Sequence, residues 1–81
     1  MIVSVQVAVY PLRQERLAPT IAAVSRALEA AGLRVEVGPM SSMATGEATV
    51  VFRALEDAFE EAAARGHVVM TLTVSNACPV G

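Results

Sequence analysis

Uncharged polar side chains recur at alternate positions in two stretches of the sequence, one near each end of the chain. The polar positions are Ser4, Gln6, Tyr10, Thr71, Thr73 and Ser75, and apolar residues stand between them. Side chains two residues apart in a strand point to the same face. If the two strands are neighbours, they build one surface that is rich in directional hydrogen-bonding groups and free of charge. Such a surface suits a partner sheet or a small polar ligand.

The carboxamide of Gln6 is the most specific group on this surface. It offers one acceptor and two donors, a pattern that matches the edge of an aminopyrimidine ring. The alternative is an ordinary solvent-exposed or cross-strand amide. Tyr10 is the only aromatic residue outside the predicted helices, so it is a candidate to stack on a flat ring while its hydroxyl hydrogen-bonds. Packing as a wedge against Pro11 and Pro39 is the alternative for Tyr10.

Two further polar residues lie next to predicted elements. Asn76 follows the last strand, where it either caps the turn before Pro79 or supplies an amide to a ligand. Glu47 begins the second helix, where the helix dipole favours a carboxylate whether or not it pairs with a cationic ligand. His67 and Cys78 have no second His or Cys at metal-ligand spacing, so we expect no metal site. The sequence has no evident nucleophile and base pair, and we expect no catalysis.

Six segments must position these residues. The patterns predict strands at Ile2–Tyr10, Leu33–Val37, Met40–Thr45 and Val68–Ser75, and helices at Ala18–Ala31 and Glu47–Arg65. The order β-α-β-β-α-β is typical of a ferredoxin-like α+β fold, in which two helices cover one face of a four-stranded antiparallel sheet. The first and third strands are then central, and the fourth is an edge strand beside the first. The three strands other than Leu33–Val37 contain no charged residue.

Apolar stripes indicate which faces build the core. The first strand contributes Val3, Val5, Val7 and Val9, the first helix Leu17, Ile21, Val24 and Leu28, the second helix Val51, Leu55, Ala58, Phe59 and Ala62, and the last strand Val68, Met70, Leu72 and Val74. These spacings of three or four in the helices and two in the strands place each set on one face. Gly32 and Gly66 follow the helices and are expected to end them.

The composition limits the class of protein. At 81 residues the chain is expected to form one domain, 1–81, whose stability gains from association. Apolar residues make up 54% and charged residues 17%, which excludes disorder, and no apolar run reaches the length of about 18 residues that a membrane span needs. We interpret the excess apolar content as surface for a homo-oligomer.

The charge balance also bears on partners and location. The chain has eight acidic residues and six arginines. The resulting net charge of −2 argues against a nucleic-acid partner. The segment Met1–Gln6 lacks the basic region of a signal peptide, so we expect a cytoplasmic protein.

Several segments together resemble a known family. Val5–Leu12, Val35–Ser42 with Gly46 and Glu47, and above all Gly66–Pro79 are similar to the MTH1187/YkoF-like family of small thiamine-binding proteins. The resemblance implies a ferredoxin-like fold, assembly through the sheets into a homodimer or homotetramer, and thiamine or its hydroxymethylpyrimidine moiety as the ligand, with no other cofactor. The ligand-facing positions that it implies are Gln6, Tyr10, Ser42, Glu47, Ser75 and Asn76.

This chain departs from the family pattern at two of the matching positions. The family more often has Thr where Ser42 stands and an acid where Thr45 stands. Ser42 keeps the hydroxyl, whereas the change at Thr45 leaves Glu47 as the nearer carboxylate for the thiazolium cation of thiamine.

Two functions are therefore weighed. The first is non-catalytic binding of thiamine or its hydroxymethylpyrimidine moiety at a sheet face associated with an oligomer. The second is a structural or regulatory homo-oligomerisation module without a small-molecule ligand. An enzyme on this fold, such as an acylphosphatase, would need a Gly-rich loop followed by Arg after the first strand, and the sequence lacks one.

Overall fold

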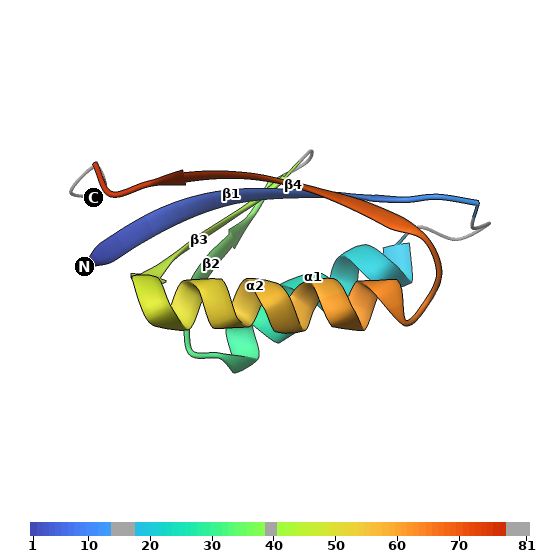
Figure 1. Cartoon of the computed structure of the whole chain (residues 1–81), viewed down its shortest axis with the longest axis horizontal. Coiled ribbons are helices and arrows are strands. Elements are labelled where there is room, and N and C mark those ends of the chain that lie inside the picture. Colours follow the sequence, from blue (N-terminus) through green and yellow to red (C-terminus); the bar gives the residue numbers. More distant parts are fainter. Residues whose placement is uncertain (14–17, 39–40, 78–81) are drawn as a thin grey trace.

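The computed structural model describes residues 1–13, 18–38 and 41–77. Its elements are β1 (Ile2–Pro11), α1 (Ala18–Ala30), β2 (Arg34–Val37), β3 (Ser42–Glu47), α2 (Ala48–Ala63) and β4 (Val68–Ser75). This order confirms the predicted ferredoxin-like α+β fold. Both helices lie against one face of the sheet and the opposite face is bare (Figure 1).

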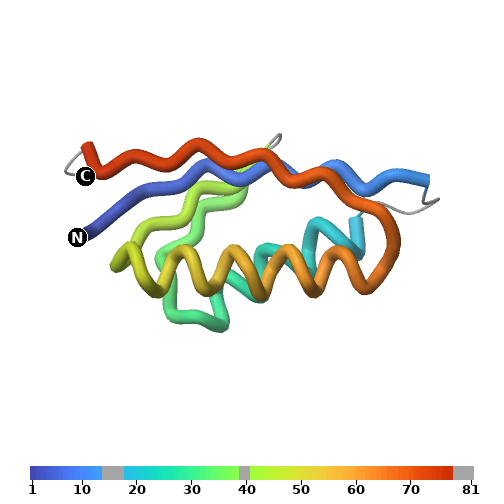
Figure 2. Tube along the Cα trace, viewed as in Figure 1, coloured from blue at the N-terminus to red at the C-terminus, as the bar shows by residue number. Residues whose placement is uncertain are grey.

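The four strands form one antiparallel sheet in the order β2-β3-β1-β4. The prediction that the first and third strands are central is confirmed, as is the position of β4 at the edge. Figure 2 shows β1 and β4 running side by side for most of their length. In this register Gln6 lies opposite Thr73, and Val5 lies between Ala44 and Val74. The polar positions of β1 and β4 therefore share one face.

The core lies between the sheet and the helices. Val3, Val5 and Val7 on β1 are almost completely buried, as predicted. Burying one such side chain is worth roughly 1.5 to 3 kcal/mol relative to leaving it exposed. Gly46 on β3 allows close packing here, because an added Cβ would lie 2.5 Å from Cδ2 of Leu33.

The ends of the helices follow from local chemistry. Gly32 follows α1 with a φ of +83°, a conformation that a residue with a Cβ adopts only at a cost. Gly66 follows α2 with a φ of +139°. At the start of α2, the amide of Ala48 donates a hydrogen bond of 2.8 Å to the carbonyl of Met1. Pairing between β1 and β3 thus continues directly into the first turn of the helix.

The predicted bounds of the third strand were wrong. The sequence predicted Met40–Thr45, whereas β3 is Ser42–Glu47 and α2 begins at Ala48. The reason is that β1 starts at Ile2 and offers backbone partners as far as Glu47, so strand pairing outlasts the alternation in side chains. Glu47 is therefore a charged residue in a strand that was expected to have none. Met40 lies outside the described residues.

Parts of the predicted apolar stripes do not reach the core. Ile21 on α1 and Phe59 on α2 are exposed, and Thr20 is buried instead. On β4, Leu72 is 44% and Val74 39% exposed although both were expected in the core. Both point to the helix side of the sheet, opposite Val7 and Val5, but the strand is at the edge, where the helices cover it incompletely. Leu17 lies outside the described residues.

Candidate ligand-binding surface

The bare face of the sheet contains a shallow hollow over β1 and β4. It encloses about 250 Å³ and is lined by Gln6, Ala8, Tyr10, Ser41, Thr71 and Thr73. The register explains this grouping, because Gln6 lies opposite Thr73 and Ala8 lies opposite Thr71. Ala8 leaves room between the larger side chains of Gln6 and Tyr10. None of the described residues that line the hollow is charged, as the sequence predicted for this surface.

The side chain of Gln6 is held by a hydrogen bond within the hollow. Its Nε2 donates to Oγ of Ser41 at 3.0 Å. This bond uses one of the three hydrogen-bonding groups of the carboxamide. The carbonyl oxygen and the second N–H can then serve a ligand whose edge carries one donor and one acceptor. Orientation before binding reduces the entropy that binding costs.

Ser42, the position implied by the family resemblance, does not face this hollow. In the register it pairs with Val7 and Val37, and it is buried on the helix side of the sheet. Its neighbour Ser41 faces the hollow instead. A weak indication of this face was present in the sequence: Ala44, two residues after Ser42, is a small apolar residue of the kind that packs beneath the helices. The segment before Gly46 alternates too weakly between polar and apolar residues for its faces to be predicted.

Of the three other predicted positions, Glu47 and Asn76 contact the N-terminal residue, and Ser75 lies between them and the hollow. Oε1 of Glu47 accepts a hydrogen bond of 2.8 Å from the ammonium group of Met1, and Nδ2 of Asn76 lies 3.8 Å from Sδ of the same Met1. Oγ of Ser75 accepts a hydrogen bond of 3.0 Å from the amide of Ala77.

The strand register measures how far apart these groups lie. Ser75 lies opposite Ser4, which is two residues along β1 from Gln6 and six from Tyr10, or roughly 7 Å and roughly 20 Å at about 3.3 Å per residue. Ser75 is therefore the next position on the bare face after Thr73, at the Gln6 end of the hollow. Gln6 and Tyr10 share the hollow, Ser75 adjoins its Gln6 end, Ser42 lies on the other face, and Glu47 and Asn76 lie beside the N-terminus.

The polar row continues between these two ends. Oγ of Ser4 and Oγ1 of Thr45 are 3.2 Å apart and hydrogen-bonded. This contact joins β1 to β3 on the bare face. On the same face, Arg34 and Glu36 of β2 lie opposite Thr45 and Met43, so the charges of the bare face among the described strands begin at β2.

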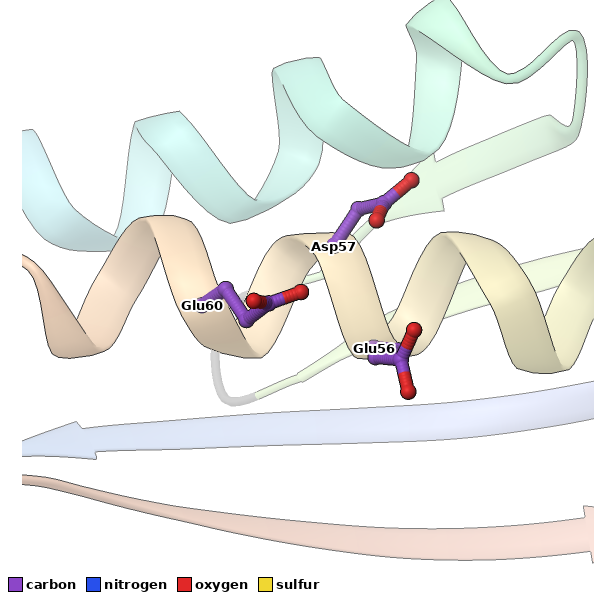
Figure 3. A group of neighbouring side chains, drawn as sticks. All are labelled: Glu56, Asp57 and Glu60. Atoms are coloured by element: carbon purple, nitrogen blue, oxygen red, sulfur yellow. The ribbon is translucent and has the colours of Figure 1, made fainter.

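A group of acidic side chains lies away from this surface. Glu56, Asp57 and Glu60 project from α2, and their carboxylate oxygens lie within 4.8 Å of one another (Figure 3). All three are exposed. Carboxylates grouped on an exposed helix surface are stabilised by water, so this group gives no reason to assign a metal site. Within the described residues, no helix is long and apolar enough to cross a membrane.

Comparison with known proteins gives the family. The model of the YKOF-related family matches residues 2–81, nearly the entire chain. The chain belongs to the YKOF-related family. No curated protein matches the sequence of this chain significantly.

Solved structures similar to this YKOF-related chain share its fold. SP2199 of Streptococcus pneumoniae is 24% identical with a TM-score of 0.87, and the alignment covers 99% of this chain and 90% of that protein. MJ1052 of Methanocaldococcus jannaschii is 18% identical with a TM-score of 0.86, covering 93% and 79%. TM0486 of Thermotoga maritima, provisionally assigned to thiamine biosynthesis or salvage, is 21% identical with a TM-score of 0.82, covering 91% and 82%.

Proposed function

We propose that this chain binds thiamine or its hydroxymethylpyrimidine moiety, without catalysing a reaction, in the hollow on the bare face of the sheet. The observation that carries the proposal is the Gln6 carboxamide, held by Ser41 beside Tyr10 in an uncharged hollow. Membership of the YKOF-related family supports it, as does the fold shared with TM0486.

The chemistry of the hollow suits an aminopyrimidine. The Gln6 carbonyl oxygen can accept a hydrogen bond from the exocyclic amino group while the remaining N–H donates to the adjacent ring nitrogen. Tyr10 offers an aromatic face for the flat ring. The hydroxyls of Thr71 and Thr73 stand on the neighbouring strand, where they can bond to a hydroxymethyl group.

The same hollow offers no carboxylate to the thiazolium cation of thiamine. Glu47 lies at the other end of the sheet, paired with the N-terminal ammonium group. Hydroxymethylpyrimidine is therefore expected to bind with an affinity within a few-fold of that of thiamine. Oxythiamine carries a carbonyl in place of the amino group and presents the wrong pattern to Gln6, so it is expected to bind at least tenfold more weakly.

Titration calorimetry with thiamine, hydroxymethylpyrimidine and oxythiamine tests the proposal. Gln6→Ala is expected to weaken hydroxymethylpyrimidine about tenfold, since a buried hydrogen-bonding pair is worth roughly 1 to 1.5 kcal/mol. Thr49→Val, on the exposed side of α2, is the matched control and should leave the affinity unchanged. Absence of both heat and thermal stabilisation at millimolar ligand would exclude the function, because a ligand of the native state must stabilise it.

A second candidate function is homo-oligomerisation through the sheet without a ligand. The observation that favours it is the bare face of the sheet, where the large side chains of Tyr10, Met43 and Val69 are exposed. A homodimer or homotetramer would cover such side chains. In this case Gln6→Ala and Tyr10→Phe would change the assembly in size-exclusion chromatography, and no thiamine compound would bind.

A further inference from the structure

A groove lies at the edge of the sheet, between α2 and β4. It encloses about 380 Å³ and is lined by Phe52, Leu55, Glu56, Phe59, Met70 and Leu72. Phe52 is 52% and Phe59 42% exposed, so two aromatic rings border the groove without being covered. The groove is on the helix side of the sheet and shares no lining residue with the hollow around Gln6.

The edge of β4 beside this groove lacks the features that normally protect a sheet edge. Within the described strands β4 pairs only with β1, and the register runs without a bulge from Val68 to Ser75. The strand contains no charged residue and no proline. Charges, prolines and bulges are the devices that keep an edge from pairing with another chain. The outer backbone groups between Val69 and Val74 can therefore pair with an added strand.

A carboxylate lies midway along the groove. Glu56 is four residues after Phe52 and three before Phe59, so these three side chains share one side of α2. Figure 3 shows Glu56 on the side of α2 that faces β1 and β4. The carboxylates of Asp57 and Glu60 lie within 4.8 Å of it. Within the described residues, none of the three forms an ion pair or a hydrogen bond.

The edge, the groove and the carboxylate together define the chemistry of an occupant. A strand that pairs with β4 lies about 4.8 Å outward from it and turns every second side chain to the helix side, over the groove. Apolar side chains at those positions would cover Phe52, Phe59 and Leu72. A guanidinium group in the same row would meet Glu56, and a pair of this kind forms two parallel hydrogen bonds.

The negative charge favours a basic partner over a second copy of this chain. A second copy offers an alternating apolar strand in its own β4, but this strand brings no cation to Glu56. Charge complementarity of this kind selects partners more than it adds affinity.

We propose that the edge of β4 and the groove beside it form a docking site for an extended segment of another protein. The segment pairs with β4 as a fifth strand, in the mode known as β-augmentation. Its helix-side row consists of apolar residues with one arginine among them. The hollow on the bare face stays open when this site is occupied.

The test uses a capped, fluorescently labelled peptide as long as β4. It has valine and leucine at alternate positions, one arginine in that row, and threonine elsewhere. Fluorescence anisotropy with the full chain is expected to show saturable binding below millimolar concentration, and ¹H–¹⁵N spectra should place the shifted amides on β4. Replacing the arginine by glutamate should weaken binding about tenfold, since attraction to Glu56 becomes repulsion.

Methylated peptides test the strand pairing itself. In an added strand, alternate amides face β4 and the others face away from it. Methylating one alternate set should abolish binding, and methylating the other set should leave it nearly unchanged.

Variants of the chain test the groove. Glu56→Gln keeps the shape of the side chain and should weaken the arginine peptide about threefold to fivefold, as expected for one exposed ion pair. Glu61→Gln on the same helix does not line the groove and is the matched control, with unchanged affinity. Phe52→Ala removes a half-exposed ring that the core does not need, and should weaken binding about fivefold.

The outcomes separate this site from the proposed function. Gln6→Ala should bind the arginine peptide like the wild type while losing affinity for hydroxymethylpyrimidine. Four results would each overturn the proposal: no saturable binding, as expected if a second copy holds the edge; equal binding of the glutamate peptide; equal binding of both methylated peptides; or unchanged affinity in both Glu56→Gln and Phe52→Ala.

Discussion

The hydroxyl of Ser41 decides how the Gln6 carboxamide is presented to a ligand. Ser41→Ala removes this hydroxyl and frees the carboxamide to rotate. Binding must then order the side chain, and the entropy lost in doing so weakens the affinity. We expect the affinity for hydroxymethylpyrimidine to fall about threefold to fivefold, consistent with the loss of one hydrogen bond. Calorimetry at constant temperature measures the change.

Ser42→Ala is the matched control for this residue. It removes the same group one position along the chain, but on the opposite face of the sheet. The affinity for hydroxymethylpyrimidine should therefore be unchanged in Ser42→Ala. Equal losses in the two variants would mean that the ligand contacts the helix side and that the hollow is not its site.

The residues of the candidate site were only partly predictable. Gln6 and Tyr10 lie on the face of the sheet that was predicted for them, because the strict alternation of β1 fixes the face of every side chain. Ser41 was missed because a shift of one residue exchanges the two faces of a strand, and β3 has no strong alternation to fix that choice. Glu47 and Asn76 were expected near the ligand, but their contacts at the N-terminus depend on which strands are neighbours, and no local pattern contains that information.

At the scale of elements, Val5 on β1 and Val74 on β4 are cross-strand partners with very different surroundings. Val5 is fully buried beneath the helices, whereas its partner Val74 is 39% exposed. Val5→Ala is expected to lower the free energy of unfolding by about 2 to 3 kcal/mol, and Val74→Ala by less than about 1 kcal/mol. Urea denaturation of both variants measures the difference. Equal losses would mean that another subunit covers Val74 in solution.

A second element-scale prediction concerns the approach of β3 to Leu33. Gly46→Ala would place a methyl group 2.5 Å from Cδ2 of Leu33, which is too close for packed atoms. Overpacking of this kind costs roughly 1 to 3 kcal/mol. Leu33→Val in the same chain shortens the opposing side chain, and we expect it to recover part of the lost stability. A double-mutant cycle measured by thermal unfolding checks this coupling, and strictly additive losses would contradict it.

Elements themselves were predictable where the signal is local. The four alternating valines were enough to predict β1. Gly32, whose φ is positive, was enough to predict where α1 ends, because both signals depend on only a few neighbouring residues. The exposure of Ile21, Phe59, Leu72 and Val74 was not predictable in this way. It depends on how far each helix extends over the edge of the sheet, which is a property of packing between distant segments.

At the scale of the whole molecule, charge and apolar surface are separated. Within the described residues, the bare face is uncharged along β1 and β4, and the edge strand β4 carries no charge that would oppose pairing with another chain. Apolar side chains of α2 and β4 are exposed next to that edge. Association of identical chains through these surfaces would therefore be hydrophobic and would depend little on salt.

Sedimentation velocity at about 0.1 M and about 1 M NaCl tests this property, because the Debye length falls from roughly 10 Å to roughly 3 Å across that range. We expect the same homo-oligomer at both concentrations. Thr73→Lys, which places a like charge from each subunit on the bare face of the edge strand, should shift the chain toward the monomer, and Glu60→Lys on the exposed side of α2 should not. Dissociation of the wild type at high salt would show instead that charged residues hold the subunits together, and these lie mainly on the helices.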